Sequence, residues 1–143
     1  MSDLLVYGSY GYTGNLIAET AVERGLDPVL AGREPRSLES QADRLQCAFE
    51  VVGLDEPTVL DLVLDDATAV LNCAGPFSRT WEPMVEACLR TGTHYLDITG
   101  EISVFEALHE RGDEAAQAGV MLLPGVGFDV VPTDGLAAHL SER

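Results

Sequence analysis

The chain has 143 residues, of which 46% are hydrophobic, so it is long and apolar enough for one globular domain and is not a disordered polypeptide. Acidic residues number 24 against 8 basic ones, all arginine, and the net charge of −16 argues against nucleic acid and anionic membranes as partners. No apolar run reaches the roughly 18 residues that span a bilayer, and the first residues lack a basic signal segment, so we expect a cytoplasmic protein.

The chain opens with an apolar run, residues 4–7, followed by glycines at every third position. The run predicts a buried parallel strand. Gly8 permits a tight turn, Gly11 lets a diphosphate approach the main chain, and Gly14 lets the next helix pack against the strand. The helix N-terminus then directs N–H groups at the phosphates. We therefore expect a dinucleotide to contact the whole loop: Gly8, Ser9, Tyr10, Gly11, Tyr12, Thr13 and Gly14.

Helical and strand patterns alternate along the rest of the chain, which is typical of βαβ units. We expect helices over residues 14–24, 35–44, 57–64, 83–90 and 102–117, and strands over 28–31, 48–52, 69–72, 94–97 and 120–123. A loop rich in glycine, proline and aspartate leads to a last helix that starts at residue 135. Right-handed crossovers predict an α/β fold: a Rossmann-type doubly wound parallel sheet of six strands, order 3-2-1-4-5-6, with helices on both faces.

Ligands of such sheets bind beyond the carboxyl ends of the strands. The unusual residues of this chain gather at those ends, in segments 8–14, 32–33, 72–77, 97–101 and 124–134 and at Asp55. The opposite ends carry ordinary turn residues such as Gly25 and Asp27. This one-sided distribution favours a ligand-binding edge.

The end of the second strand bears on which dinucleotide binds. An NAD site usually places a carboxylate there, whereas this chain has Arg33, with Arg36 one helical turn further on. A guanidinium can bind a 2′-phosphate with two charge-assisted hydrogen bonds, so we expect NADP (NADPH) in preference to NAD. Glu34, next to Arg33, counts against this reading, and a simple surface turn at Arg33 is the alternative.

Two further segments are candidate cofactor contacts. Asp55 follows the third strand and either accepts a hydrogen bond from the adenine amino group or caps the helix after it. The fourth strand ends in a run of small residues that suits close passage of the backbone past ribose and nicotinamide, with a plain Gly-Pro turn as the alternative. This run consists of Asn72, Cys73, Ala74, Gly75 and Pro76.

Five segments carry a family resemblance: GSYGYTG, LAGR, VLNCAGPF, YLDITGE and PGVGFDVVPTD. Together they resemble the N-terminal cofactor domain of saccharopine dehydrogenase-like oxidoreductases, a family that includes bacterial trans-acting enoyl reductases. The resemblance covers essentially all 143 residues. It implies an NAD(P)-binding Rossmann domain over residues 1–143 and hydride transfer between NADP(H) and a small-molecule or lipid substrate. It also implies a C-terminal catalytic domain that this chain lacks, so we expect the isolated chain to be inactive.

Three other functional classes share features with this chain. Short-chain dehydrogenases share the glycine loop but use a Tyr-x-x-x-Lys pair, and this chain contains no lysine. Acyl-phosphate reductases need a nucleophilic cysteine after the sixth strand, whereas the last cysteine here is Cys88. A non-catalytic sensor or scaffold domain that binds a dinucleotide remains open.

Residues with catalytic chemistry fall near the expected nicotinamide end, but none is assigned a catalytic role, because turn and helix capping explains each of them equally well. They are Asp97, Thr99, Glu101 and Asp129. The three cysteines and three histidines show no metal-ligand spacing, so we expect no metal site.

Two expectations concern the whole molecule. The acidic excess and the absence of lysine predict a halophilic source with a saline cytoplasm, an ordinary acidic domain being the alternative. Apolar surface around residues 130–140, left by a missing domain, could drive association into a homo-oligomer.

Overall fold

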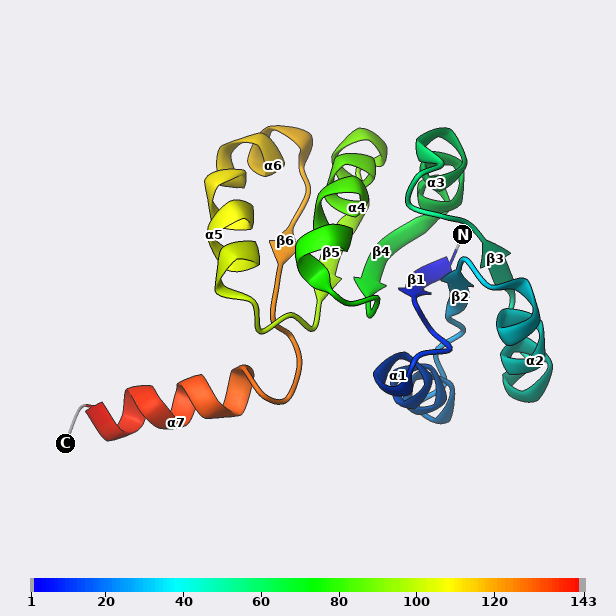
Figure 1. The fold of residues 1–143 in the computed structure, drawn as a ribbon, viewed down its shortest axis with the longest axis horizontal. Coiled ribbons are helices and arrows are strands. Elements are labelled where there is room, and N and C mark those ends of the chain that lie inside the picture. Colours follow the sequence, from blue (N-terminus) through cyan, green and yellow to red (C-terminus); the bar gives the residue numbers. More distant parts are fainter. Residues whose placement is uncertain (1, 142–143) are drawn as a thin grey trace.

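The computed structural model describes residues 2–141, and within them six strands form one parallel sheet (Figure 1). Its order is β3-β2-β1-β4-β5-β6, and every neighbouring pair is parallel. The predicted doubly wound sheet and its strand order are therefore confirmed. The strands are β1 (Ser2–Tyr7), β2 (Val29–Gly32), β3 (Phe49–Val51), β4 (Ala67–Asn72), β5 (His94–Asp97) and β6 (Leu122–Leu123).

Helices cover both faces of the sheet. They are α1 (Tyr12–Glu23), α2 (Pro35–Leu45), α3 (Pro57–Asp65), α4 (Phe77–Thr91), α5 (Ile102–Glu110), α6 (Gly112–Ala118) and α7 (Val131–Ser141). Helices α1 and α2 lie on one side of the sheet, and α3 and α4 lie on the other (Figure 1). Right-handed crossovers produce this division, because the chain moves outward in one direction from β1 to β3 and in the other from β4 to β6.

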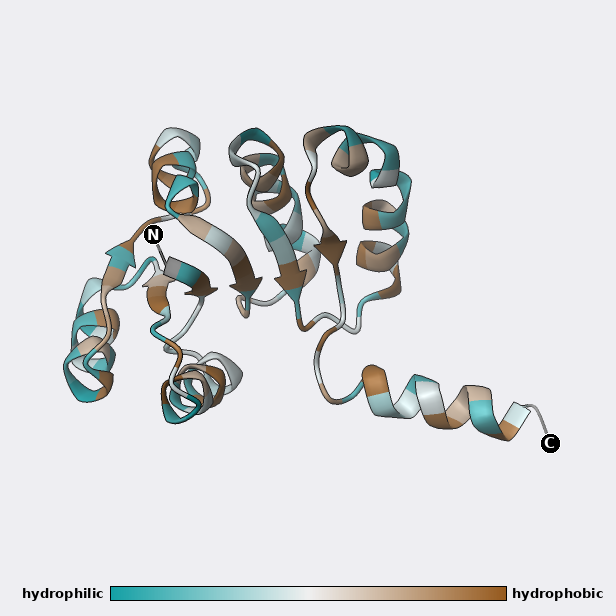
Figure 2. Cartoon of the chain, turned by 180° about the vertical axis from the view of Figure 1, so that it is seen from behind, coloured by the Kyte–Doolittle hydropathy of each residue, from teal (hydrophilic) through white to brown (hydrophobic). Residues whose placement is uncertain are grey.

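The core has two parts, one on each face of the sheet. The larger part packs Leu5, Val70 and Tyr95 of the strands against Met84 and Val85 of α4, all of them fully buried. The smaller part packs Leu30 of β2 against residues of α1 and α2, namely Ala18, Leu38 and Ala42. Figure 2 shows the hydrophobic colour toward the carboxyl ends of β1, β4 and β5 and in bands along the helices, as expected where central strands are covered by helices.

The largest differences between predicted and observed helices are at α4, at α5 with α6, and at α7. Helix α4 begins at Phe77, six residues before the predicted start, and holds Pro83 inside it. A proline is most often found in the first turn of a helix, and that preference misplaced the boundary. The predicted helix 102–117 is two helices, because α5 ends at Glu110 and α6 begins at Gly112.

Helix α7 extends away from the rest of the domain (Figure 1). It begins at Val131 instead of the predicted residue 135, and each of its residues from 131 to 141 is exposed. Leu136 and Leu140 are among the large apolar side chains that face solvent there. In residues 2–141, none of the helices combines the length and hydrophobicity needed to cross a bilayer.

Candidate dinucleotide-binding site

The glycine loop joins β1 to α1 at the carboxyl edge of the sheet. Gly8 has a φ of +74°, a left-handed conformation that glycine adopts without strain. A Cβ atom on Gly14 would lie 2.3 Å from the carbonyl oxygen of Gly8, so only glycine permits this approach of the helix to the loop. Gly11 is the N-cap of α1 and supplies no side-chain cap, and no acidic residue lies in the first turn. The first N–H groups of α1 are thus directed toward the edge of the sheet, in the arrangement that binds phosphate.

The two tyrosines of the loop differ in their surroundings. Tyr10 is half-buried, and its ring lies over Gly32, where a Cβ atom would come within 2.6 Å of the ring carbon Cε1. Tyr12, the first residue of α1, is 87% exposed, and Thr13 after it is also exposed. Tyr10 therefore forms the wall between the loop and the end of β2, whereas Tyr12 faces solvent.

Ser9 connects the loop to α2. Its side chain is fully buried, and its hydroxyl donates a hydrogen bond to Oε1 of Gln41 at 2.8 Å. Sequence reasoning missed Gln41. A usable signal exists: Leu38, Gln41 and Ala42 are the buried residues of α2, and a glutamine on such a stripe indicates a buried polar contact.

The buried phenol of Tyr7 lies beside Val52, the residue that follows β3. The Tyr7 hydroxyl donates to the carbonyl oxygen of Val52 at 3.2 Å. The pKa of Tyr7 is raised to about 12, chiefly by burial and to a smaller extent by Tyr10 and Asp55, while the positive charge of Arg33 acts to lower it. The charges of Arg33 and Asp55 thus act on the same phenol, with opposite effects on its pKa.

Asp55 is not the cap of the following helix. Helix α3 begins at Pro57 with Glu56 as its N-cap, and the Glu56 carboxylate accepts a hydrogen bond from the N–H of Gly53 at 3.1 Å. Asp55 lies over Gly53, where a Cβ atom would come within 2.4 Å of its Oδ1 atom. Of the two sequence alternatives the helix cap is wrong, and the adenine contact stays a prediction.

A polar pocket of about 410 Å³ lies between α1 and α2, beside the loop. Among the described residues that line it there are two arginines and no carboxylate, which is unusual in a chain of net charge −16. Arg44 pairs with Glu19 at 2.5 Å, whereas Arg36 forms no ion pair with any residue in 2–141. The lining residues are Tyr10, Asn15, Arg36, Ser37, Ser40, Gln41 and Arg44.

The run that follows β4 lies directly against the glycine loop. A Cβ atom on Gly8 would be 3.1 Å from Cβ of Ala74, and the N–H of Cys73 donates to the carbonyl oxygen of Tyr7 at 2.8 Å. Asn72 is fully buried and accepts a hydrogen bond from the N–H of Ala74 at 3.0 Å, so its side chain shapes the turn. The turn continues through a cis peptide bond between Gly75 and Pro76.

Cys73 is a protonated thiol under ordinary conditions. Its desolvation by burial and the nearby negative charge of Asp97 raise its pKa to about 12. Because the thiolate is the reactive form, Cys73 is a poor nucleophile.

The polar residues at the end of β5 connect loops. Asp97 is fully buried and accepts hydrogen bonds from the Tyr95 hydroxyl at 2.8 Å and from the N–H groups of Thr99 at 3.0 Å and Gly125 at 2.9 Å. Thr99 in turn accepts from the N–H of Glu101. These contacts support the interpretation that Asp97 holds the turn after β5. Thr99 also bonds within this turn, but it does not cap α5, whose N-cap is Glu101.

Glu101 caps a helix that is distant in the sequence. Its carboxylate accepts hydrogen bonds from the N–H groups of Phe77 at 2.7 Å and Ser78 at 3.0 Å, at the start of α4. Hydrogen bonds from the Ser78 side chain and from these two N–H groups hold the pKa of Glu101 below its ordinary value. Asp129, the fourth candidate, is exposed in the loop before α7.

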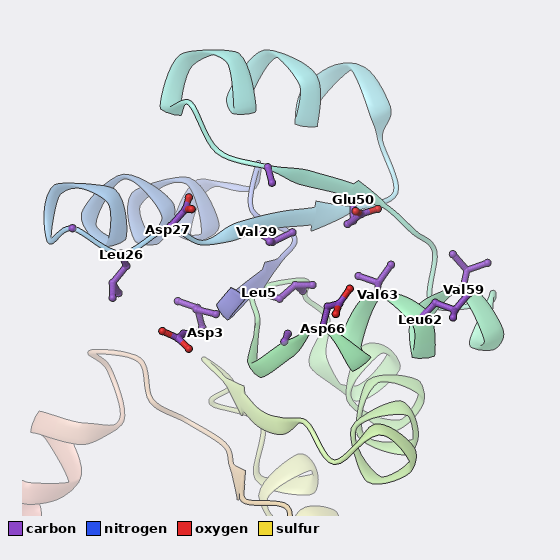
Figure 3. Close-up of a pocket in the computed structure, with 14 residues that line it drawn as sticks. Asp3, Leu5, Leu26, Asp27, Val29, Glu50, Val59, Leu62, Val63 and Asp66 are labelled. Atoms are coloured by element: carbon purple, nitrogen blue, oxygen red, sulfur yellow. The ribbon is translucent and has the colours of Figure 1, made fainter. Parts of the chain in front are cut away.

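A larger hollow, of about 820 Å³, lies at the opposite edge, where the strands begin (Figure 3). Leu5, Val29 and Val63 form its apolar lining. Its other lining residues include four carboxylates and no basic residue: Asp3, Asp27, Glu50 and Asp66. Like charges repel a diphosphate, so this hollow does not suit a dinucleotide.

Comparison with known proteins places the chain in a family. The family model described as the saccharopine dehydrogenase NADP binding domain matches residues 4–123. The chain belongs to this family. The resemblance noted from the sequence motifs is thereby confirmed.

Similar proteins carry related names. The chain is 32% identical over 151 residues to the saccharopine dehydrogenase-like oxidoreductase of Rattus norvegicus, a match covering 92% of this chain and 35% of that protein. It is 30% identical over 152 residues to the trans-acting enoyl reductase of Mycobacterium ulcerans (strain Agy99), a match covering 99% of this chain and 36% of the relative. The chain thus spans about a third of the length of these relatives.

Solved structures share the fold. The apo saccharopine dehydrogenase (L-Glu forming) of Saccharomyces cerevisiae has a TM-score of 0.77 at 20% identity, covering 90% of this chain and 28% of that one. AtPrR2 with NADP+ and (+)pinoresinol has a TM-score of 0.64 at 17% identity, covering 89% of this chain and 50% of that one. At these identities the likeness shows the fold alone.

Proposed function

We propose that this saccharopine dehydrogenase-family domain binds NADP(H) along the carboxyl edge of its sheet and is the cofactor domain of an oxidoreductase. The observation that carries the proposal is the close packing of Gly8 and Gly14, which directs the uncapped N-terminus of α1 at the edge. The family description and the oxidoreductase names of the relatives support the same function.

Each part of the edge suits one part of the cofactor. The loop from Gly8 to Gly14 holds the diphosphate at the helix N-terminus. Its inner residues are Ser9, Tyr10, Gly11, Tyr12 and Thr13. Asp55 accepts from the adenine amino group. The run from Asn72 to Pro76 lies along the ribose and nicotinamide of the cofactor. It also includes Cys73, Ala74 and Gly75. When bound, NADP(H) would donate or accept a hydride, and these residues would orient the cofactor for that transfer.

NADP(H) is preferred over NAD(H) in this proposal because of two arginines. Arg33 and Arg36 form no ion pair with any residue in 2–141, although the chain has three acidic residues for each basic one. The pocket beside Arg36 offers hydroxyls of Ser37 and Ser40 and no carboxylate. Such a surface accepts the two negative charges of a 2′-phosphate.

The substrate is a small molecule or lipid, and groups beyond residues 1–143 complete the reaction. Asp97 and Glu101 each accept two or more hydrogen bonds within the domain, so neither is available as a proton donor to substrate. Cys73 is held protonated and partly buried. We therefore expect that the isolated chain binds cofactor but does not oxidise NADPH when substrate is added.

A calorimetric titration tests the cofactor preference. The purified chain is titrated with NADPH and, separately, with NADH in molar KCl. We expect NADPH to bind at least about tenfold more tightly, which corresponds to one extra charge-assisted contact. Equal affinity for the two cofactors would contradict the preference, and binding of neither would contradict the proposed function.

A further inference from the structure

The side chain of Gln41 is a buried polar group within an apolar stripe of α2. It is 4% exposed and stands between Leu38 and Ala42, which pack into the smaller core. Burying an amide without partners is strongly unfavourable, so its partners indicate what the residue does.

All of those partners lie in the glycine loop or at the start of α1. The Gln41 Oε1 atom accepts from the Ser9 hydroxyl at 2.8 Å, and Nε2 donates to the Ser9 carbonyl oxygen at 2.9 Å. Nε2 also donates to Oδ1 of Asn15 at 3.1 Å. Ser9 and Gln41 thus bind each other in both directions, which fixes the backbone of residue 9 relative to α2.

A second set of contacts orients Asn15. Its Oδ1 atom also accepts from Arg44 at 2.6 Å, and its Nδ2 atom donates to Glu19 at 3.1 Å. Arg44 pairs with the same carboxylate of Glu19. Asn15 therefore presents its oxygen to Gln41, and the network connects α1, α2 and the loop.

We propose that Gln41 is a positioning residue for dinucleotide binding. Through Ser9 it holds the glycine loop in the conformation that directs N–H groups at the diphosphate, so the loop is ordered before the cofactor arrives. This inference rests on the proposed function. Gln41 also lines the pocket beside Arg36. Its amide atoms, however, are bonded to Ser9 and Asn15, so its effect passes through the loop. The positioning role makes a distinct prediction, because the diphosphate held by the loop is common to NADPH and NADH.

The test replaces Gln41 by methionine, which has similar length and no amide. We expect Gln41→Met to weaken NADPH and NADH by the same factor, about tenfold, since the loop must then be ordered on binding. Ser9→Ala, a milder change that keeps the fold, should weaken both cofactors equally. The double variant should lose little beyond Gln41→Met, because the two residues act as a pair.

Leu38→Ala is the matched control. It removes a buried side chain from the same stripe of α2 and breaks no hydrogen bond to the loop. It should lower Tm while leaving both Kd values unchanged at temperatures where the variant is folded. If Gln41→Met leaves both Kd values unchanged, or weakens NADPH alone, the positioning role is refuted.

Amide hydrogen exchange of residues 9–14 in the cofactor-free protein separates this inference from the proposed function. Exchange should be faster in Gln41→Met than in the wild type and unchanged in Leu38→Ala. Unchanged exchange in Gln41→Met would refute the positioning role. A wild-type chain that binds no dinucleotide would refute the proposed function, whatever the exchange rates show.

Discussion

Single residues at the carboxyl edge differ in how directly the sequence reveals them. The spacing of Gly8 and Gly14 predicted a close approach of helix and strand, and the 2.3 Å contact of a Cβ on Gly14 with the Gly8 carbonyl shows that approach. Gln41 was missed because its partner Ser9 is 32 positions away. A pattern of short-range spacing cannot pair residues so distant, although a glutamine on a buried stripe marks the position.

Arg33→Asp tests the residue that separates the two cofactors. A carboxylate at this position repels a 2′-phosphate and accepts hydrogen bonds from ribose hydroxyls. We expect the variant to bind NADPH about ten- to a hundredfold more weakly than the wild type, and to bind NADH more tightly than NADPH.

The measurement is again calorimetry, with Arg24→Asp as the control for net charge. Arg24 follows α1 at the opposite edge of the sheet, so this variant changes charge equally and should keep the wild-type preference. An Arg33→Asp variant that still prefers NADPH would show that Arg33 does not determine the cofactor preference.

At the scale of elements, the start of α4 depends on a loop 23 or more positions away. Helix α4 has no side-chain cap of its own at Pro76, and Glu101 provides the acceptors for Phe77 and Ser78. A carboxylate there also interacts favourably with the helix dipole. The sequence pattern placed the helix start at residue 83, because the cap that stabilises the first turn lies in another loop.

Glu101→Gln tests this cap through its pH dependence. The folded pKa of Glu101 is lowered, so its charged form stabilises the fold above the ordinary glutamate pKa, and this contribution is lost as pH falls through the lowered value. We expect a lower Tm than wild type at pH 7, and a difference that shrinks toward zero in acid. Thermal melts over pH 2.5–7, a range chosen to cover about two units below the ordinary pKa, measure it.

Glu106→Gln on α5 is the control, because Glu106 is exposed and its removal changes charge equally. A Tm difference for Glu101→Gln that stays constant with pH would contradict the cap.

The observations on single residues and on whole elements together show which features the sequence could predict and which it could not. The sheet order and the approximate positions of all six strands follow from the alternation of apolar runs with helical patterns and from crossover handedness. The hydrogen bond of Asp97 with the N–H of Gly125, 28 positions away, could not be paired from local spacing. The start of α4 was misplaced because its first N–H groups are bonded by Glu101, which is equally distant from a local pattern.

At the scale of the whole molecule, the charge of −16 is the dominant feature. The charge of the lining residues nonetheless differs between the two edges of the sheet. Carboxylates line the hollow at the amino edge, whereas arginines line the pocket beside the glycine loop. Of these two hollows, the pocket beside the glycine loop therefore suits an anionic group better.

A salt series tests the proposal of a halophilic source. Self-repulsion among the acidic residues is screened in molar salt, where the Debye length is about 3 Å, against about 30 Å at 0.01 M. We expect Tm to rise from low salt to molar KCl by more than it rises in sucrose of equal osmolality, which leaves charges unscreened. A melt that is insensitive to KCl would contradict the proposal.

The most direct test of the account is to locate the bound cofactor by NMR. Isotope-labelled protein is titrated with NADPH, and the amide shifts are mapped on the sheet. The account predicts shifts concentrated in residues 8–14, at Arg33 and Asp55, and in residues 72–76. Shifts concentrated around Asp3, Asp27, Glu50 and Asp66, or no shifts at saturating NADPH, would contradict it.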